Sequence, residues 1–317
     1  MTSPGYLRFP HVHGDLLAFI ADDDVWLAPV SGGRAWRVSA DRAPVSYPRL
    51  SRDGAALAWT SRREGEPEVL VADVDGGRCQ RLTYWSDPGT RVVGWTPAGD
   101  VLALTAAGAP FERLTWAHVI PRGGGAPQRL PFGPVSDLAF GAGSVALLTG
   151  STGRDPAYWK GYRGGTAGRL WVGPADGGTA LRRVLAGLPT QFACPMLVGG
   201  RLAFISDHEG TGNIYSCRLD GSGLLRHTDH DGRYARQAST DGERIVYQCA
   251  GEIWLLADLG PGSQPQRLDI TLGSAVTGRA ARLVSAADQL GSLSCDHSGR
   301  ASVIEVSGTV HWLTHRD

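Results

Sequence analysis

The chain has no net charge, no long apolar run and no paired-cysteine motif, and each absence argues against a class of protein. Arginine and lysine together number 31, and aspartate and glutamate also number 31, so no overall field attracts nucleic acid. No stretch of about 18 apolar residues occurs, which argues against a membrane-spanning helix. The first residues lack the basic and apolar regions of a secretion signal. We therefore expect a cytoplasmic protein with neither a nucleic-acid nor a membrane partner.

The motifs of common catalytic and metal sites are also missing. The five cysteines are scattered and never form Cys-x-x-Cys, so we expect reduced thiols rather than a disulfide framework. Neither a Gly-x-Ser-x-Gly elbow nor a phosphate-binding Walker loop occurs. His11 and His13 lie two apart on a predicted strand, but zinc sites need three or four ligands. The sequence therefore predicts no catalytic residue, no metal and no cofactor in this chain.

What the sequence does contain is a repeat of short strands with glycine-bearing turns. The clearest unit has predicted strands at residues 47–50, 55–61, 68–73 and 78–83, which together form an antiparallel meander. Six copies of the second strand are visible. Their central residues, spaced 40, 45, 43, 57 and 43 apart, are Ala18, Ala58, Ala103, Ala146, Ala203 and Val246. Blades of a β-propeller repeat with a similar period of roughly 40–50 residues.

The repeat predicts an all-β fold, a six-bladed β-propeller of four-stranded antiparallel blades over residues 1–270. One such unit cannot bury both faces of its sheet, so packing the units around a ring is the stable arrangement, with very little helix. Residues 271–290 are rich in alanine, serine and glycine and are expected to form a linker. Residues 291–317 are expected to be the first strands of a following, truncated propeller domain. A single seven-bladed ring is the alternative.

The longest spacing contains an insertion, Pro156 to Trp171, that combines cationic and aromatic side chains. Such groups can hold a peptide carboxylate or stack on one another, so the insertion could guide a peptide or seat another domain. The alternative is that its aromatic residues only pack over the top of a blade. The candidate substrate-channel or interface residues, which all lie in loops of one face, are Arg91, Arg154, Tyr158, Trp159, Lys160, Tyr162 and Arg163.

Several segments together resemble the N-terminal six-bladed propeller of tricorn proteases, along essentially the whole chain. They are HGDLLAFIADDDVWL at 13–27, YWKGYRGGTAGRLWV at 158–172, SDHEGTGNIYS at 206–216, and Tyr234-x-Arg236 with Thr240-Asp241-Gly242. Tricorn proteases are large cytosolic serine peptidases that form hexamers and trim oligopeptides. The resemblance implies that a further propeller, a PDZ-like domain and a peptidase domain of the parent hydrolase lie outside this sequence.

The function that this resemblance implies is non-catalytic: the propeller guides or gates oligopeptide substrates or products for a catalytic domain absent from this chain. The family can hold a peptide C-terminus with two adjacent arginines between the second and third blades, whereas residues 86–91 here offer only Arg91. A freestanding TolB-like protein-interaction propeller is the alternative. A third hypothesis, a propeller enzyme with a metal or paired carboxylates in its funnel, would need such side chains on the inner strands. We expect the chain alone not to cleave peptides.

Overall fold

The computed structural model describes residues 6–41, 43–150, 157–176, 180–273, 283 and 285–315. The chain divides into two compact units, Met1–Ala275 and Val276–Asp317. Strands dominate both units, and the helical structure within the described ranges is the 3-10 turn η2 (Ala287–Gln289). None of the described segments forms a helix long and apolar enough to cross a membrane. The predicted all-β fold with very little helix is confirmed.

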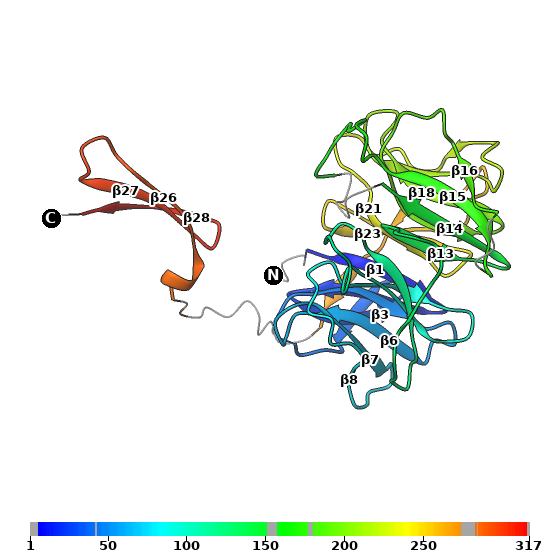
Figure 1. Ribbon diagram of the computed structural model, residues 1–317, viewed down its shortest axis with the longest axis horizontal. Coiled ribbons are helices and arrows are strands. Elements are labelled where there is room, and N and C mark those ends of the chain that lie inside the picture. Colours follow the sequence, from blue (N-terminus) through cyan, green and yellow to red (C-terminus); the bar gives the residue numbers. More distant parts are fainter. Residues whose placement is uncertain are drawn as a thin grey trace. The chain divides into compact units, whose positions relative to one another are not determined.

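The first unit consists of six antiparallel sheets, or blades, each built from four strands in sequence order (Figure 1). Blades 1 to 3 are β1 (Arg8–His13), β2 (Leu16–Ala21), β3 (Asp24–Pro29), β4 (Gly33–Arg37); β5 (Val45–Leu50), β6 (Ala56–Ser61), β7 (Glu68–Asp73), β8 (Gln80–Arg81); and β9 (Arg91–Trp95), β10 (Val101–Thr105), β11 (Trp116–Ile120), β12 (Gln128–Arg129). Blades 4 to 6 are β13 (Asp137–Phe140), β14 (Ser144–Thr149), β15 (Arg169–Pro174), β16 (Arg182–Val184); β17 (Phe192–Val198), β18 (Arg201–Ser206), β19 (Asn213–Arg218), β20 (Leu225–Arg226); and β21 (Arg236–Thr240), β22 (Ile245–Cys249), β23 (Glu252–Leu256), β24 (Gln266–Arg267). The predicted six-bladed propeller is confirmed.

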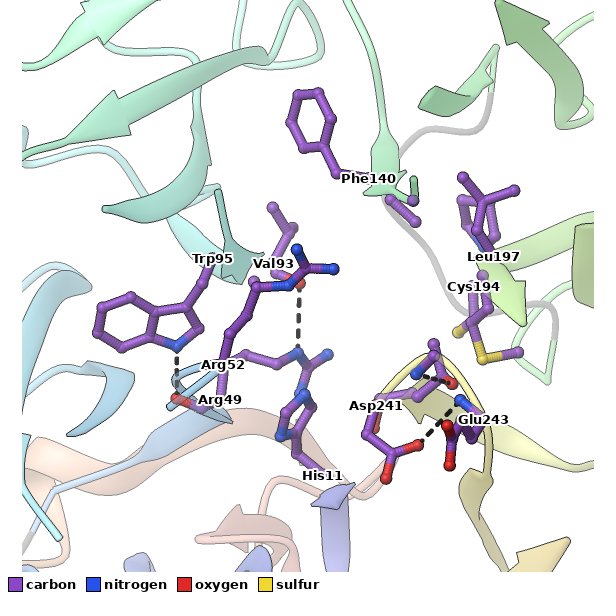
Figure 2. Close-up of a pocket in the computed structure, with 18 of the residues that line it drawn as sticks. His11, Arg49, Arg52, Val93, Trp95, Phe140, Cys194, Leu197, Asp241 and Glu243 are labelled. Atoms are coloured by element: carbon purple, nitrogen blue, oxygen red, sulfur yellow. Dashed lines mark hydrogen bonds between the residues drawn. The ribbon is translucent and has the colours of Figure 1, made fainter. Parts of the chain in front are cut away.

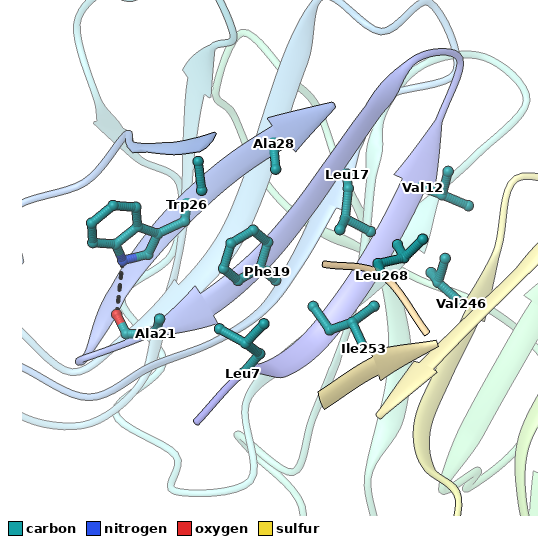
Figure 3. Packing of buried hydrophobic residues seen from close by; sticks show 11 residues of the cluster. Leu7, Val12, Leu17, Phe19, Ala21, Trp26, Ala28, Val246, Ile253 and Leu268 are labelled. Atoms are coloured by element: carbon teal, nitrogen blue, oxygen red, sulfur yellow. Dashed lines mark hydrogen bonds between the residues drawn. The ribbon is translucent and has the colours of Figure 1, made fainter. Parts of the chain in front are cut away.

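The core lies between the blades, because every blade buries both of its faces against its neighbours. Side chains alternate along a strand. On β6, Ala56 and Ala58 therefore pack toward blade 3, whereas Leu57 and Trp59 pack toward blade 1. The ring is closed by a cluster between blades 1 and 6, which includes Phe19 and Val246 (Figure 3). Full burial of a large apolar side chain contributes about 1.5–3 kcal/mol, so these clusters are the main source of the ring's stability.

The innermost strands carry a bulge at the same place in four blades. The register of β1, β5, β17 and β21 with the second strand shifts within each of these blades. One residue in each bulge takes a positive φ, and these residues are Phe9 (51°), Tyr47 (52°), Cys194 (50°) and Gln237 (53°). A bulge re-aims the side chain that it carries. It brings the rings of Phe9 and Tyr47, from adjacent blades, to a centroid distance of 4.5 Å.

A short strand after the sixth blade returns to the first. β25 (Ile270–Leu272) pairs in parallel with the outer strand β4, so that blade 1 has five strands. The amide of Gly33 donates to the Asp269 carbonyl at 2.7 Å, and the amide of Gly273 donates to the Ala35 carbonyl at 3.1 Å. This strand begins at the last residue of the predicted propeller and continues into the predicted linker.

The second unit is a three-stranded antiparallel sheet made of β26 (Leu290–Cys295), β27 (Ala301–Val306) and β28 (Thr309–Thr314). Its apolar side chains remain largely uncovered, and Trp312 is 65% exposed. A sheet with this much exposed apolar surface is incomplete as a folding unit. Its assignment to a following propeller stays a prediction.

Candidate functional site

The ring has two unlike faces, and a cavity opens on each of them. The inner strands begin at the interblade segments and end at the tight turns that join them to the second strands. We call the first face, which also carries the second-to-third connections, the loop face, and the opposite one the turn face. The cavity on the loop face measures about 380 Å³ and the one on the turn face about 780 Å³.

The loop-face cavity is rich in arginine. It is formed at the mouth of blades 1, 2 and 3, and its charged lining residues are Arg8, Arg62, Arg91, Arg113 and Glu112. Two of these arginines already have exposed partners: Arg8 pairs with Asp23 at 3.4 Å, and Arg62 with Glu66 at 3.1 Å. Pairs of this kind contribute little and are easily exchanged for another anion. The lining of the cavity thus carries four guanidinium groups and one carboxylate, and two of the guanidinium groups pair with carboxylates outside the lining, those of Asp23 and Glu66.

Arg113 and Arg91 occupy different environments within this cavity. The Arg113 guanidinium stands 5.4 Å from the centroid of the Phe111 ring, and Phe111 itself is exposed. Arg91, at the start of β9, donates a hydrogen bond to the carbonyl of Ser136 and lies 6.0 Å from the ring of Tyr47. Arg113 is therefore oriented by an exposed contact, whereas Arg91 is held against the next blade.

Of these four arginines, Arg91 alone belongs to the site residues predicted from the sequence. Arg8, Arg62 and Arg113 were missed, because they come from three different blades and only the packing of these blades brings them together. A usable signal was present. Arg62 and Arg113 lie in the two loops, 62–67 and 106–115, that connect the second and third strands of blades 2 and 3 on this face.

The described part of the insertion, residues 157–171, folds onto blades 5 and 6. The carboxylate of Asp207 is fully buried and receives Arg163 Nη1 at 2.9 Å and the amide of Gly161 at 2.9 Å. The hydroxyl of Thr190 donates to the same carboxylate at 3.0 Å. These bonds fix the middle of the insertion to the ring.

Apart from Arg163, which pairs with Asp207 of blade 5, aromatic and cationic side chains of the insertion meet one another or blade 6. Trp159 and Tyr162 are in ring contact at 4.9 Å. Lys160 lies 5.4 Å from the Tyr234 ring, and Arg236 lies 5.0 Å from the ring of Tyr158, which is 71% exposed. The predicted site residues Tyr158, Trp159, Lys160, Tyr162 and Arg163 are thus brought together, while Arg154 lies outside the described residues. A role for them in an interface stays a prediction.

The turn-face cavity is lined by the ends of the inner strands that lead into the tight turns (Figure 2). Nδ1 of His11 accepts a hydrogen bond from the Leu50 amide at 3.2 Å. Burial, reinforced by the charge of Arg49, holds the pKa of His11 well below its usual value, so this ring is neutral. The carboxylate of Asp241 forms a salt bridge with the guanidinium of Arg244 at 2.6 Å. The described residues contain no cluster of three or more potential metal ligands.

Comparison with known proteins gives consistent results. The family described as Tricorn protease N-terminal beta propeller domain matches residues 4–260. Tricorn protease homolog 1 of Streptomyces coelicolor is 54% identical over 315 residues, which are 99% of this chain and 29% of that protein. Putative tricorn protease homolog 2 of the same organism is 49% identical over 327 residues, covering 100% and 27% respectively. This chain therefore spans less than a third of the length of these relatives.

A solved structure agrees with the sequence matches. The crystal structure of the tricorn protease superposes with a TM-score of 0.82 at 26% identity, over 98% of this chain and 30% of that chain. The similarity covers the first unit's ring together with the strands that follow it in sequence.

Proposed function

Because this chain belongs to the family of tricorn protease N-terminal β-propeller domains, we propose that it guides and gates oligopeptides for a peptidase domain elsewhere in its parent protein. In this proposal the chain itself is not catalytic. The parent is a cytoplasmic serine-type peptidase assembled as a homo-oligomer, a hexamer by family resemblance. Residues 291–317 open the following propeller, whose next strands would cover the exposed apolar side chains of the second unit.

The observation that carries the proposal is the arginine-lined cavity on the loop face. Every oligopeptide with a free C-terminus presents a carboxylate, and the planar guanidinium fork matches a carboxylate in shape and charge. The resemblance implied two adjacent arginines for this task. Here Arg8, Arg62, Arg91 and Arg113 from three blades supply the positive charge instead. The cavity has room for a C-terminal residue or two, at about 380 Å³.

Binding of a fluorescein-labelled pentapeptide with a free C-terminal carboxylate tests this function, with fluorescence anisotropy as the readout. We expect saturable binding that weakens with salt and is lost for the same peptide with an amidated C-terminus, which lacks the charge. Arg113→Gln should weaken binding by about tenfold or more, since a hydrogen bond to a charged group contributes about 1.5–3 kcal/mol.

The matched control is Arg267→Gln, which removes an exposed arginine paired with Glu252 on blade 6, outside the cavity. It should leave the affinity unchanged. Equal binding of the acid and amide peptides, or equal losses in the two variants, would show that the cavity does not hold the carboxylate.

A further inference from the structure

We propose that a groove on the outer rim of the ring, between blades 5 and 6, is a second binding site and that it takes a proline-rich peptide segment. The groove measures about 590 Å³ and lies beside the outermost strands β20 and β24. Among the described residues it shares no lining side chain with the loop-face or the turn-face cavity. We call it the rim groove and define it by Arg226, His227, Asp229, His230, Trp254 and Pro265. This site goes beyond the proposed function and does not depend on it.

One wall of the rim groove is the segment that follows β20, and Asn213 holds it in place. The Asn213 side chain accepts a hydrogen bond from the His230 amide at 2.8 Å and donates one to the His230 carbonyl at 3.1 Å. Its oxygen also accepts a bond from the Thr228 hydroxyl at 2.7 Å. The third strand begins with an acidic residue in blades 1, 2 and 6, and a carboxylate there could not donate to a carbonyl. Asn213 is fully buried, so this wall is fixed by the fold itself.

The hydrogen bonds of His230 leave one N–H of its ring unused. Its Nε2 lies 2.9 Å from the hydroxyl of Tyr247, a fully buried residue whose hydroxyl has no other partner in the described part of the chain. Burial raises the pKa of this hydroxyl, so it keeps its proton and donates a hydrogen bond to Nε2. Burial also lowers the pKa of His230, which is therefore neutral and carries its one proton on Nδ1. No described residue accepts from that N–H, and Nδ1 is open to solvent.

His227 carries a second unused N–H for the same reason. Ser216 Oγ accepts a hydrogen bond from Arg201 Nε at 2.9 Å, so its own proton is directed to Nε2 of His227 at 2.7 Å. Burial and then the charge of Arg201 lower the pKa of His227, which is therefore neutral with its proton on Nδ1. Nδ1 is accessible and meets no acceptor within the described ranges. Two residues that line the rim groove thus carry N–H groups without an acceptor.

Trp254 forms an aromatic wall from blade 6, with its ring edge to face with that of His230 at a centroid distance of 5.1 Å. Trp26 and Trp171 hold the equivalent place on the third strands of blades 1 and 4, each paired with an arginine of the fourth strand. Their indole N–H groups donate to a carbonyl and a hydroxyl, both at 2.9 Å. The N–H of Trp254 has no partner and is covered from solvent, so the indole has to turn before a ligand reaches it. Native proteins satisfy nearly all buried donors, and an unmade bond beside a cavity points to a ligand.

The charges at the rim groove balance, which argues against an anion as its ligand. The guanidinium of Arg226 pairs with Glu209 at 2.9 Å and also with Asp229, while both histidines are neutral. The Asp229 carboxylate is exposed and would repel an incoming anion. The groove therefore offers hydrogen-bond donors without a net positive charge, and a neutral acceptor fits it better than a carboxylate or a phosphate.

A proline-rich segment supplies the acceptors that the rim groove lacks. Its carbonyl groups accept hydrogen bonds, whereas its proline residues have no N–H that would itself need an acceptor. Such a segment is already extended in solution, so ordering it costs little conformational entropy. Proline rings pack well in grooves lined by aromatic side chains, and Trp254, His230 and Pro265 provide such a lining. At about 590 Å³ the groove has the size of an ordinary ligand pocket.

Fluorescence anisotropy of a fluorescein-labelled octaproline with an amidated C-terminus tests the site. Amidation removes the carboxylate that the loop-face cavity is proposed to hold, so the two sites are tested separately. We expect saturable binding, and much weaker binding of an amidated alanine–serine octapeptide, in which every residue brings an N–H. Trp254→Ala should weaken octaproline binding by about tenfold or more. The matched control is Trp36→Ala, which removes an exposed tryptophan of blade 1 and should leave the affinity unchanged.

Two substitutions of His230 separate a role in binding from a role in structure. In His230→Gln the amide takes the place of Nε2 and can still accept from Tyr247, but the donor at Nδ1 is lost. In His230→Asn the amide takes the place of Nδ1, so the donor remains and the bond from Tyr247 is lost. We expect His230→Gln to bind octaproline about threefold or more weakly than His230→Asn, although His230→Asn should have the lower melting temperature. Circular dichroism verifies that each variant is folded.

The outcomes separate the rim groove from the proposed function. Absence of octaproline binding, equal binding of the alanine–serine peptide, or an unchanged affinity in folded Trp254→Ala overturns the rim groove. Displacement of octaproline by the unlabelled pentapeptide acid would place both ligands in the loop-face cavity and contradict a second site. If Trp254→Ala does not fold, the His230 pair decides, and binding by His230→Gln that equals or exceeds that of His230→Asn contradicts the proposal. A pentapeptide acid that fails to bind contradicts the proposed function alone.

Discussion

At the scale of single residues, Asp207 decides how the cationic and aromatic insertion is held. Its carboxylate has no exposed surface, while the side chain of its partner Arg163 remains 34% exposed. Besides the bond from Arg163, this carboxylate accepts hydrogen bonds from the Gly161 amide and the Thr190 hydroxyl. Glu209, two residues further along the chain, accepts a hydrogen bond from the hydroxyl of Tyr215. A buried carboxylate is tolerable only when its oxygens are satisfied in this way.

Replacement of Asp207 by alanine is expected to destabilise the ring by about 3 kcal/mol, because breaking a buried ion pair leaves unpaired polar groups behind. Removing one partner of a buried ion pair typically costs about 3–5 kcal/mol, and we expect the lower value because the partly exposed guanidinium of Arg163 can be hydrated again. Asp229→Ala, which removes the carboxylate that pairs with Arg226 at the surface, should change the free energy of unfolding by no more than about 0.5 kcal/mol. Urea unfolding of both variants measures the difference. If the two variants lose a similar free energy of unfolding, Asp207 does not anchor the insertion.

The sequence predicted the insertion residues from their composition, but it could not predict Asp207 as their partner. Asp207 and Arg163 are 44 residues apart, and nothing local to either residue indicates the pair. The sequence did contain a signal for the bulges of the inner strands. Pro10 and Pro48 occupy equivalent positions in the repeat, and proline within a strand is typical of bulges.

At the scale of elements, strand positions were predictable because side-chain alternation and turn glycines both mark them. The third strand of the clearest unit has the predicted bounds, Glu68–Asp73. The fourth strand was predicted at residues 78–83 and is only Gln80–Arg81. An outermost strand has a partner on one side alone, so its ends lack the ladder bonds that would extend it. The last two residues of β25, Thr271 and Leu272, were assigned to a linker because a strand of three residues gives no periodic signal.

The pairing of β25 with β4 can be tested by a glycine that leaves no room for a side chain. A Cβ on Gly32, whose φ is +87°, would lie 2.7 Å from the Asp269 carbonyl, whereas one on Gly76, with a φ of +94°, would meet nothing within 4 Å. Both substitutions to alanine carry the same backbone penalty of roughly 1–2 kcal/mol. Gly32→Ala should therefore destabilise the protein more than Gly76→Ala, and it should accelerate hydrogen exchange at Gly33 and Gly273, the two amides of this pairing. Equal stabilities and exchange rates would mean that β25 does not hold the ring.

At the scale of the whole molecule, the sequence predicted the ring and its family, since six similar units and the segments around residues 158–172 carry both. It could not predict the arginine-lined cavity. The cavity depends on residues such as Arg8 and Arg113, more than a hundred positions apart, that the packing of blades 1 to 3 brings together. The family assignment leaves the TolB-like alternative without a supporting observation. The second unit's place in a following propeller stays a prediction.

If this chain holds peptides without cutting them, a bound peptide stays intact, and mass spectrometry of that peptide measures whether it does. The pentapeptide is incubated with the chain at concentrations that saturate binding, released by acid and weighed. We expect recovery of the peptide at its full mass with no fragments. Fragments that accumulate with time, and that disappear when a residue of this chain is substituted, would contradict it.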